Sequence, residues 1–419
     1  MLDIKFIREN LDLVKEAVRK KRLTVNLDQL ITLDDSRLVV LREVEALRAK
    51  QNEASDAIAK VNNDDKQTLI SEMKKVKEAL TLGEERLRET TREWQKLMLE
   101  VPNIPDMSVS EGDTEADNVE LKVWGDKPNF DFQPRDHTVL LGQHHLVDFE
   151  RGAKVAGFRG YFLTGGAVTL SFVLWQLARE LLSKDGFEQM IVPSLVRPEA
   201  FLGTGYLPQG IDDLYQTQDG DFLAGTAEVA TMGYFLDEVI PVTELPKKIA
   251  AFSPCFRREA GSHGKDTKGL IRVHEFYKVE QVILCEANHE ESVRWHEALL
   301  ETAEKLMQVL GLPYRVVVNC SGDLGLGQVK KYDIEAWVPA EGKYRETHSI
   351  SYFHDFQTRR LNTKYKDVEG KLRFAHSLNG TLAATPRLLV SVIENYQTKD
   401  GRVKIPTALR PYFDGEYLV

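Results

Sequence analysis

Several features that mark common protein classes are scarce or missing in this sequence of 419 residues. Its three cysteines, Cys255, Cys285 and Cys320, are odd in number, widely spaced and outside any Cys-x-x-Cys pair. This pattern indicates neither a disulfide framework nor a zinc site. No apolar run approaches the roughly 20 residues that a membrane-spanning helix needs, and the first residues carry acids instead of the apolar core of a secretory signal. We therefore expect a cytoplasmic protein without a membrane partner.

Two common nucleotide-binding motifs are also missing. The chain has no Walker A sequence, and no Gly-x-Gly-x-x-Gly sequence follows a predicted strand. The glycine-rich run at 322–327 precedes a predicted strand, so we expect a loop there. If the protein uses ATP, it must hold the nucleotide on a different scaffold.

Positive charge is in deficit, because 55 Lys and Arg face 65 Asp and Glu, and the net charge is −10. Such a balance argues against a general nucleic-acid binder and against a DNA partner. The charges balance within residues 1–100, however, and the rest of the chain carries the whole deficit. If the protein binds RNA, residues 1–100 provide the surface that repels it least.

The N-terminal part of the chain contains two long heptad patterns. Apolar positions recur at alternating steps of three and four over 30–61 and again over 69–97, with a turn-forming run of Asn and Asp at 62–65. These patterns predict an antiparallel coiled-coil hairpin over about 28–98. A dimerisation or spacer hairpin would show the same periodicity. The hairpin ends at the Pro-Asn-Ile-Pro run at 102–105, and a polar, acidic linker then marks a domain boundary.

Beyond about residue 125 the pattern becomes mixed. Residues 166–184 predict a helix with an apolar face, and an extended run that ends at Pro193 follows it. Further extended segments are expected at 222–229, 250–256, 270–284, 314–320, 331–338, 344–353 and 373–379, and further helices at 289–310 and 383–396. Few βαβ units lie among them, so we expect an α+β fold with an antiparallel sheet and flanking helices.

The most informative stretch runs from Phe256 to Glu280, FRREAGSHGKDTKGLIRVHEFYKVE. Two arginines and a glutamate lead into a loop with three glycines and two lysines, and an alternating segment typical of a strand follows. Cations around flexible glycines in an acidic protein indicate a site for a polyanion. A solvated hairpin loop would have a similar composition.

The order of these residues resembles the second signature motif of class II aminoacyl-tRNA synthetases, and in detail the bacterial type of the seryl-tRNA synthetase family. Residues 166–193 resemble the first motif, which builds the homodimer interface in that family. Residues 378–387 (LNGTLAATPR), before the helical LLVSVIENYQ, resemble the third. The run at 102–105 and the later Asp117–Glu120 also match, so the resemblance covers nearly the whole chain.

This resemblance implies three parts and a reaction. The parts are an N-terminal helical tRNA-binding arm at 1–107, a linker at 108–125 and a class II catalytic domain at 126–419. The reaction activates L-serine with ATP to seryl-adenylate and transfers serine to the 3′ end of tRNA(Ser). Whether a selenocysteine tRNA, tRNA(Sec), is also charged stays open.

The implied ATP site follows from what the chemistry needs. A guanidinium binds two phosphate oxygens at once, and by resemblance Arg257 would hold the α-phosphate while Arg387 grips the γ-phosphate. Glu259 would accept from the adenine amino group, and Phe276 would stack on the ring. Arg257, Glu259 and Arg387 are the expected catalytic residues. The expected ATP-binding residues are Arg257, Arg258, Glu259, Val273, Phe276, Glu346, Thr347, His348, Ser349 and Arg387.

The resemblance also implies a Mg²⁺ ion with the ATP, held by hard oxygen ligands. The stretch Glu346-Thr347-His348-Ser349 aligns with the Glu-x-Ser-Ser sequence of the family, so Glu346 and Ser349 would approach the metal. His348 stands where the family has serine. Pro386 stands where it often has glycine or a small polar residue, and proline is tolerated in a first helical turn.

For L-serine the resemblance implies a pocket that holds both the ammonium and the hydroxyl. Thr226-Ala227-Glu228 matches the serine-binding Thr-x-Glu sequence, and Glu280 matches the carboxylate that accepts from the substrate hydroxyl. Thr381 fills a position for a small hydroxyl residue. A buried acceptor that alanine leaves unpaired can discriminate by roughly 10⁴-fold.

In this family the helical arm grips the long variable arm of the tRNA through shape and backbone contacts, which makes binding salt-sensitive. The candidates in this chain are lysines of the outer hairpin, among interleaved acids: Lys60, Lys66, Lys74, Lys75 and Lys77.

Two other functions fit parts of the sequence. A synthetase-like ligase could charge a carrier protein or make a small product, but relatives of that kind commonly lack the arm. A non-catalytic coiled-coil protein could retain a dead synthetase body, but Arg257, Glu259, Glu280, Glu346 and Arg387 are all present.

Overall fold

The computed structural model describes residues 1–58, 63–261, 264 and 266–418, and its contacts divide the chain into two compact units. The helical unit contains Asp3–Arg19 and Leu23–Pro102. The other unit, which we call the sheet unit, contains Met1–Leu2, Lys20–Arg22 and Asn103–Val419. In the described residues, no helix is long and apolar enough to cross a membrane.

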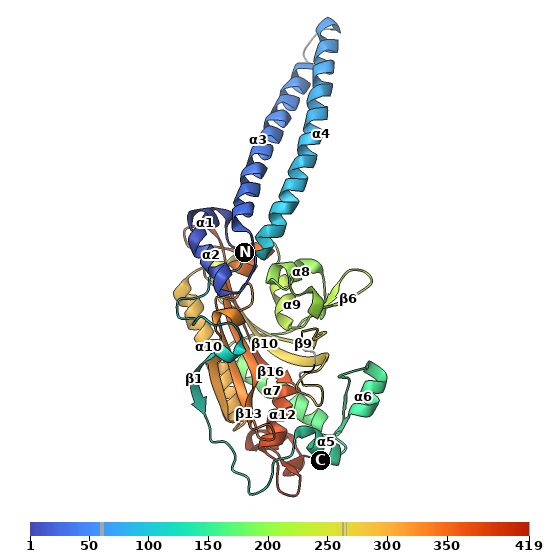
Figure 1. Ribbon diagram of the computed structural model, residues 1–419, viewed down its shortest axis with the longest axis vertical. Helices are drawn as coiled ribbons and strands as arrows, with labels where there is room; N and C mark the ends of the chain where they lie inside the picture. The colour runs from blue at the N-terminus through green and yellow to red at the C-terminus, as the bar shows by residue number, and fades with distance from the viewer. Residues whose placement is uncertain (59–62, 262–263, 265, 419) are drawn as a thin grey trace. The chain divides into compact units, whose positions relative to one another are not determined.

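The helical unit is dominated by two long helices, α3 (Leu27–Ile58) and α4 (Asn63–Glu100), which run side by side as a hairpin (Figure 1). Two short helices, α1 (Ile4–Glu9) and α2 (Leu11–Lys20), precede them. Val40, Val44 and Leu80 are buried between the long helices, at the spacing that the heptads predicted. The expected hairpin is therefore confirmed.

The predicted turn between the two helices is partly wrong. Residue 62 lies outside the described residues, but residues 63–65 already belong to α4. Asn and Asp are favoured at helix N-termini as well as in turns, because their short acceptors and negative charge suit the free N–H groups there. The same composition therefore predicts either position.

The sheet unit is built on an eight-stranded sheet. In spatial order its strands are β1 (Val119–Trp124), β11 (Tyr314–Val318), β12 (Lys330–Val338), β13 (Lys343–His354), β16 (His376–Thr385), β10 (Glu275–Cys285), β9 (Lys247–Phe256) and β4 (Glu188–Ile191). All neighbours are antiparallel except β4 and β9. The predicted α+β class and its antiparallel sheet are confirmed.

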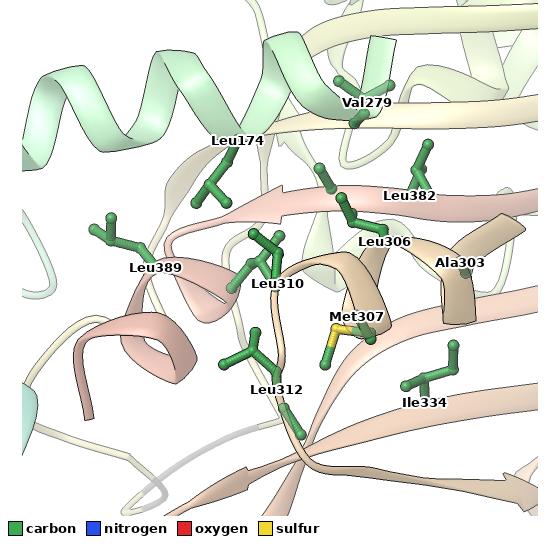
Figure 2. Close-up of a cluster of buried hydrophobic side chains, with 14 of the residues drawn as sticks. Leu174, Val279, Ala303, Leu306, Met307, Leu310, Leu312, Ile334, Leu382 and Leu389 are labelled. Atoms are coloured by element: carbon green, nitrogen blue, oxygen red, sulfur yellow. The ribbon is translucent and has the colours of Figure 1, made fainter. Parts of the chain in front are cut away.

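Three helices cover one face of this sheet: α7 (Gly166–Lys184), α10 (His289–Val309) and α12 (Arg387–Asn395). Figure 2 shows apolar side chains of helices and strands in one cluster, among them Leu174, Leu306 and Leu389 from the helices and Val279 and Leu382 from the strands. All five side chains are buried. Strand side chains alternate between faces, and the other face carries a second apolar cluster over β9 and β10, with Ile249, Val282 and Leu284, as well as polar residues.

Smaller elements complete this unit. The helices are α5 (His137–Gln143), α6 (Phe149–Ala156), α8 (Pro198–Thr204), α9 (Ala227–Gly233) and α11 (Phe356–Leu361). The short strands are β2 (Val147–Asp148), β3 (Phe162–Leu163), β5 (Leu195–Val196), β6 (Tyr215–Gln216), β7 (Phe222–Leu223), β8 (Val239–Pro241), β14 (Lys364–Lys366), β15 (Leu372–Phe374), β17 (Val403–Lys404) and β18 (Tyr417–Leu418). Five short 3₁₀ turns are η1 (Glu115–Asp117), η2 (Ile211–Asp213), η3 (Val242–Glu244), η4 (Ser321–Asp323) and η5 (Thr407–Tyr412).

Three predicted element boundaries are wrong. The expected strand at 222–229 stops at Leu223, and Thr226 then caps α9. The expected strand at 270–284 begins only at Glu275. Residues 383–385 continue β16 rather than open the following helix, which begins at Arg387. In each case an apolar run lies across the end of an element, and periodicity over so few residues does not locate that end.

Candidate active site

Two adjoining hollows lie over the middle strands β10, β13 and β16. We call the smaller, of about 60 Å³, the Arg387 hollow, and the larger, of about 290 Å³, the Glu280 hollow. Both are lined by Arg257, Lys278, Glu346 and Thr381. Cations and carboxylates therefore converge on one region of the sheet from three strands.

Strand β10 contributes one side chain every second residue. Phe276, Lys278 and Glu280 line the hollows, while Val279 between them packs into the core. This is the alternation of a strand with one buried face. A β-bulge then matches Glu280 with Thr381 on β16, so that both reach the Glu280 hollow.

A second β-bulge brings Glu346 and Ser349 together. Residues three apart on a regular strand face opposite sides of the sheet. In β13, however, Ile334 pairs with His348 and Glu335 pairs with Glu346, so Thr347 is the extra residue. Both Glu346 and Ser349 consequently line the Glu280 hollow, and the intervening His348 turns into the protein interior.

The innermost group of the Glu280 hollow is a buried triad of side chains. Thr226 Oγ1 donates to Glu280 Oε2 at 3.1 Å and accepts from Lys278 Nζ at 2.8 Å. Lys278 also pairs directly with Glu280, whose exposure is only 2%. Thr226 caps helix α9, and its hydroxyl also accepts from the backbone N–H of Glu228. The local helix start thus fixes the hydroxyl that faces Glu280.

Glu228 is held by a separate hydrogen-bond chain. Its carboxylate accepts from Gln357 Nε2 at 2.6 Å and from Tyr206 OH at 3.0 Å. Ser377 donates to Gln357 Oε1, which fixes the orientation of that amide. Burial raises the pKa of Glu228 to about 7. The nearby charge of Glu280 also raises this pKa, while the hydrogen bonds from Gln357 and Tyr206 lower it.

Cations and acids alternate around the Arg387 hollow. Arg387, the first residue of α12, donates from Nε to Ile271 O at 2.9 Å and lies 3.5 Å from Glu346 Oε2. Arg272 pairs with Glu259. Arg257 lies with its guanidinium carbon 5.3 Å from the centre of the Phe276 ring. These are the groups that a nucleotide needs, namely guanidinium forks, an acceptor and an aromatic face.

Glu346 and Ser349 fit a magnesium ion. Mg²⁺ takes few protein oxygens and keeps waters and substrate phosphates as its other ligands. Glu346 is half exposed to the hollow, and it shares that hollow with Ser349. Burial acts to raise the pKa of Glu346, but the charges of Arg387, Lys331 and Arg257 lower it. An ionised carboxylate beside a hydroxyl is a suitable donor set for a hard cation.

The structure brings most, but not all, of the predicted site residues together. Val273 and Thr347 line the Arg387 hollow with the residues described above. Three predicted residues line neither hollow. Arg258 is exposed, and Ala227 is buried in α9. His348 is buried, with Nδ1 2.8 Å from Thr347 Oγ1 and Nε2 2.8 Å from Leu382 O. Burial lowers the pKa of His348 to about 4, so it is neutral at pH 7.

The lysines proposed for the arm are described only in part. Lys74, Lys75 and Lys77 are exposed on α4. Lys60 lies outside the described residues, and the side chain of Lys66 is not described. In the loop after Glu259, residues 262, 263 and 265 lie outside the described residues as well.

Several residues of the site were missed from the sequence. Lys278 could have been found, because it lies at the same period of two as Phe276 and Glu280. Tyr206 and Gln357 carried no such signal, since they come from loop or helical segments far from the motifs. Arg272 lies within the Phe256–Glu280 stretch but was assigned no role there. Their roles follow only from the contacts in the folded chain.

An antiparallel sheet that carries a cationic strand–loop–strand over β9 and β10, and an arginine at the head of the helix after β16, is the core of a class II aminoacyl-tRNA synthetase. Residues 215–396 match the family model of the tRNA synthetase class II core domain (G, H, P, S and T). Residues 1–105 match the model of the seryl-tRNA synthetase N-terminal domain.

Similar proteins narrow the class further. The chain is 46% identical to the serine–tRNA ligase of Deinococcus radiodurans over 99% of this chain and 98% of that one. It is 42% identical to that of Thermodesulfovibrio yellowstonii over 98% of each. The solved seryl-tRNA synthetase of Pyrococcus horikoshii complexed with ATP has a TM-score of 0.89 at 36% identity, covering 100% of this chain and 99% of that one. This chain belongs to the seryl-tRNA synthetase family.

Proposed function

We propose that this chain, as a serine–tRNA ligase, activates L-serine in the Glu280 hollow with ATP from the Arg387 hollow and then transfers serine to tRNA(Ser). The observation that carries this assignment of sites is the buried group of Thr226, Lys278 and Glu280 beside Arg257, which lines both hollows. In the first step the serine carboxylate attacks the α-phosphorus of ATP and pyrophosphate leaves. In the second, a hydroxyl of the terminal ribose of the tRNA attacks the seryl carbonyl and AMP leaves.

The serine side recognises a small zwitterion. Glu280 accepts a hydrogen bond from the serine hydroxyl, and the ionised Glu228 carboxylate attracts the ammonium group. Alanine would leave the buried Glu280 carboxylate without that hydrogen bond, which costs free energy because a buried acceptor has lost its water. Thr381, the other hydroxyl residue expected in the serine pocket, lines the same hollow from β16.

The nucleotide side stabilises phosphate charge. Arg257 holds the α-phosphate, Arg387 the γ-phosphate, Glu259 the adenine amino group and Phe276 the adenine ring. Glu346 and Ser349 would hold Mg²⁺, which would offset the negative charge of the phosphates. The position of Arg257 in the lining of both hollows supports its proposed role of holding the α-phosphate next to the serine carboxylate.

The functional unit that we propose is a homodimer formed through α7 and β4. Phe172 on α7 is 62% exposed and Ile191 on β4 is 85% exposed. Both line an apolar surface hollow of about 450 Å³ with Trp175, Met190 and Phe252. A contiguous apolar surface of this kind indicates a protein interface, and it lies on the segment that matches the first class II motif.

We propose that the helical unit is the tRNA(Ser)-binding arm. We also propose that the protein acts in the cytoplasm. Lys74, Lys75 and Lys77 supply exposed positive charge on α4. Contacts between lysines and phosphates raise affinity without reading sequence, and they weaken as salt rises.

The test compares charging of tRNA(Ser) with serine by three forms of the full chain: the unaltered protein, the triple variant Lys74→Glu, Lys75→Glu and Lys77→Glu, and a control. The control reverses the charge of three exposed lysines of the sheet unit, Lys366, Lys371 and Lys404. We expect the arm variant to raise the KM for tRNA at least about tenfold while serine-dependent ATP–pyrophosphate exchange stays unchanged. A control that impairs charging as strongly as the arm variant would contradict the assignment of the arm.

A further inference from the structure

The loop at 325–328 forms one wall of the Glu280 hollow. Gly325, Leu326, Gly327 and Gln328 all line that hollow, together with Glu280, and none of them lines the Arg387 hollow. The loop therefore borders the side that we assign to serine and not the side that we assign to the nucleotide. Residues 325–327 belong to the glycine-rich run at 322–327 that precedes β12.

All four backbone carbonyls of this loop accept hydrogen bonds from two residues that lie outside the hollow. Lys21 Nζ donates to Gly325 O at 3.0 Å, to Leu326 O at 3.0 Å and to Gln328 O at 2.6 Å. Asn103 donates from Nδ2 to Gly327 O at 3.1 Å and from its backbone N to Leu326 O at 2.9 Å. Neither residue lines the hollow.

This arrangement is costly to build, which argues against an accidental contact. Lys21 is 4% exposed, and burial lowers its pKa to about 7. The three hydrogen atoms of an ammonium group match the three carbonyls that it contacts. A buried ammonium is normally balanced by a carboxylate, but the hydrogen bonds described for Lys21 Nζ all go to this loop.

The loop is also fixed from its other side. Gln328 donates from Nε2 to Ser351 Oγ at 2.8 Å and accepts at Oε1 from Gly325 N at 2.6 Å. At Gly327 a Cβ atom would lie 2.6 Å from the Phe356 ring, so the backbone approaches that ring as closely as only glycine allows. These contacts do not satisfy the loop's carbonyls, which depend on Lys21 and Asn103. Without those donors the carbonyls would have to turn towards other donors, which would shift this wall of the hollow.

We infer that Lys21 and Asn103 are positioning residues for amino-acid binding, acting through the 325–328 loop without touching a substrate. The inference rests on the assignment of serine to the Glu280 hollow. Lys21 follows α2 directly in sequence, and Asn103 lies three residues after the end of α4. Along the chain, one residue therefore precedes the long helical hairpin and the other follows it.

The test measures KM for serine and KM for ATP separately, in ATP–pyrophosphate exchange by the full-length protein. Lys21→Met keeps most of the aliphatic side chain and removes the donors, and Asn103→Asp keeps the shape and removes the Nδ2 donor. Both variants are expected to raise the KM for serine at least about tenfold, the scale of a lost buried hydrogen bond, and to leave the KM for ATP within about twofold. Lys20→Met is the matched control, and both of its KM values should equal those of the unaltered protein.

A general loss of structure would change both KM values or abolish exchange, so the split between the two substrates identifies the positioning role. If Lys21→Met does not fold, Lys21→Gln and Asn103→Ser are milder substitutions for which the same split is expected. Unchanged serine KM in folded variants, or equal changes for serine and ATP, would overturn the inference. Absence of serine-dependent exchange in the unaltered protein would instead contradict the proposed function itself.

Discussion

The two hollows of the active site hold their charges in different ways. In the Glu280 hollow the carboxylates of Glu228 and Glu280 are almost fully buried and already bonded to Tyr206, Gln357, Thr226 and Lys278. In the Arg387 hollow Arg387 and Glu346 are partly exposed and face each other at 3.5 Å. The first hollow is organised before a ligand enters, and the second offers cations whose present partners a polyphosphate can replace.

This difference suits the two ligands that we propose for the hollows. A small amino acid offers few contacts, so its selection depends on buried groups that cannot turn to water when the wrong ligand enters. A nucleoside triphosphate carries several negative charges, so partly exposed guanidinium groups suffice to bind it. These groups need less exact placement than the buried groups that select serine. The following predictions test whether the two hollows separate in this way.

The largest effect is expected at Arg257, which lines both hollows. Arg257→Ala should lower kcat/KM for ATP–pyrophosphate exchange by about 10³-fold or more, because it removes charge stabilisation at the α-phosphate. Arg258→Ala is the matched control, since Arg258 is exposed and lines neither hollow. A loss of similar size in the control would remove the distinction between the neighbouring arginines.

Glu280→Gln should act on the serine side alone. The variant leaves the buried Lys278 without its charged partner and weakens the acceptor for the substrate hydroxyl. We expect the KM for serine to rise about 100-fold and the KM for ATP to stay within about twofold, as measured by exchange at varied concentrations of each substrate. Equal changes in the two constants would show that the hollows are not separate.

Arg387→Ala should change the KM for ATP and leave the KM for serine nearly unchanged, and the change should be smaller than that expected for Glu280→Gln. Its guanidinium is partly exposed, so water compensates some of the lost interaction, and we expect the KM for ATP to rise about tenfold with little change for serine. Measurement in the same exchange assay, at saturating serine, makes the comparison direct. A dominant effect on serine would place Arg387 in the wrong half of the site.

The smallest effect is a pH dependence confined to serine. Glu228 has a pKa of about 7, above its ordinary value, because it is buried. Its carboxylate must be ionised to attract the serine ammonium group, so protonation at lower pH weakens binding. Between pH 6 and pH 8 we expect the KM for serine to fall by up to about tenfold as Glu228 ionises, while the KM for ATP stays level.

The substitution Glu228→Gln is the control for this pH profile. It should raise the KM for serine at every pH and remove the slope between pH 6 and pH 8. A slope that persists in this variant would belong to another group and would contradict the role of Glu228.

Much of the nucleotide side could be predicted from the sequence, because its residues lie within a few ordered stretches. Phe256–Glu280 holds the arginines, the acid and the aromatic ring in one strand–loop–strand segment. The spacing of Glu346 and Ser349 could not be understood in the same way. Three residues apart, they share a face only because of the bulge at Thr347, and a bulge depends on the pairing with β12.

The serine side was less accessible to sequence reasoning. Thr226 was expected in a strand, but it caps a helix, and the capping bond is what orients its hydroxyl. Tyr206 and Gln357 contact Glu228 from segments far away in the chain. Likewise, Lys21 lies within four consecutive basic residues at 19–22, and only the fold shows that its side chain is buried. Long-range contacts of this kind have no local pattern.

The central claim is that the buried group around Glu280 makes this site specific for serine. The most direct measurement is amino-acid-dependent ATP–pyrophosphate exchange, with Mg²⁺, for each of the twenty amino acids. The account predicts strong exchange with serine and an exchange rate with alanine lower by roughly 10⁴-fold. Strong exchange with a different amino acid, or equal exchange with serine and alanine, would contradict it.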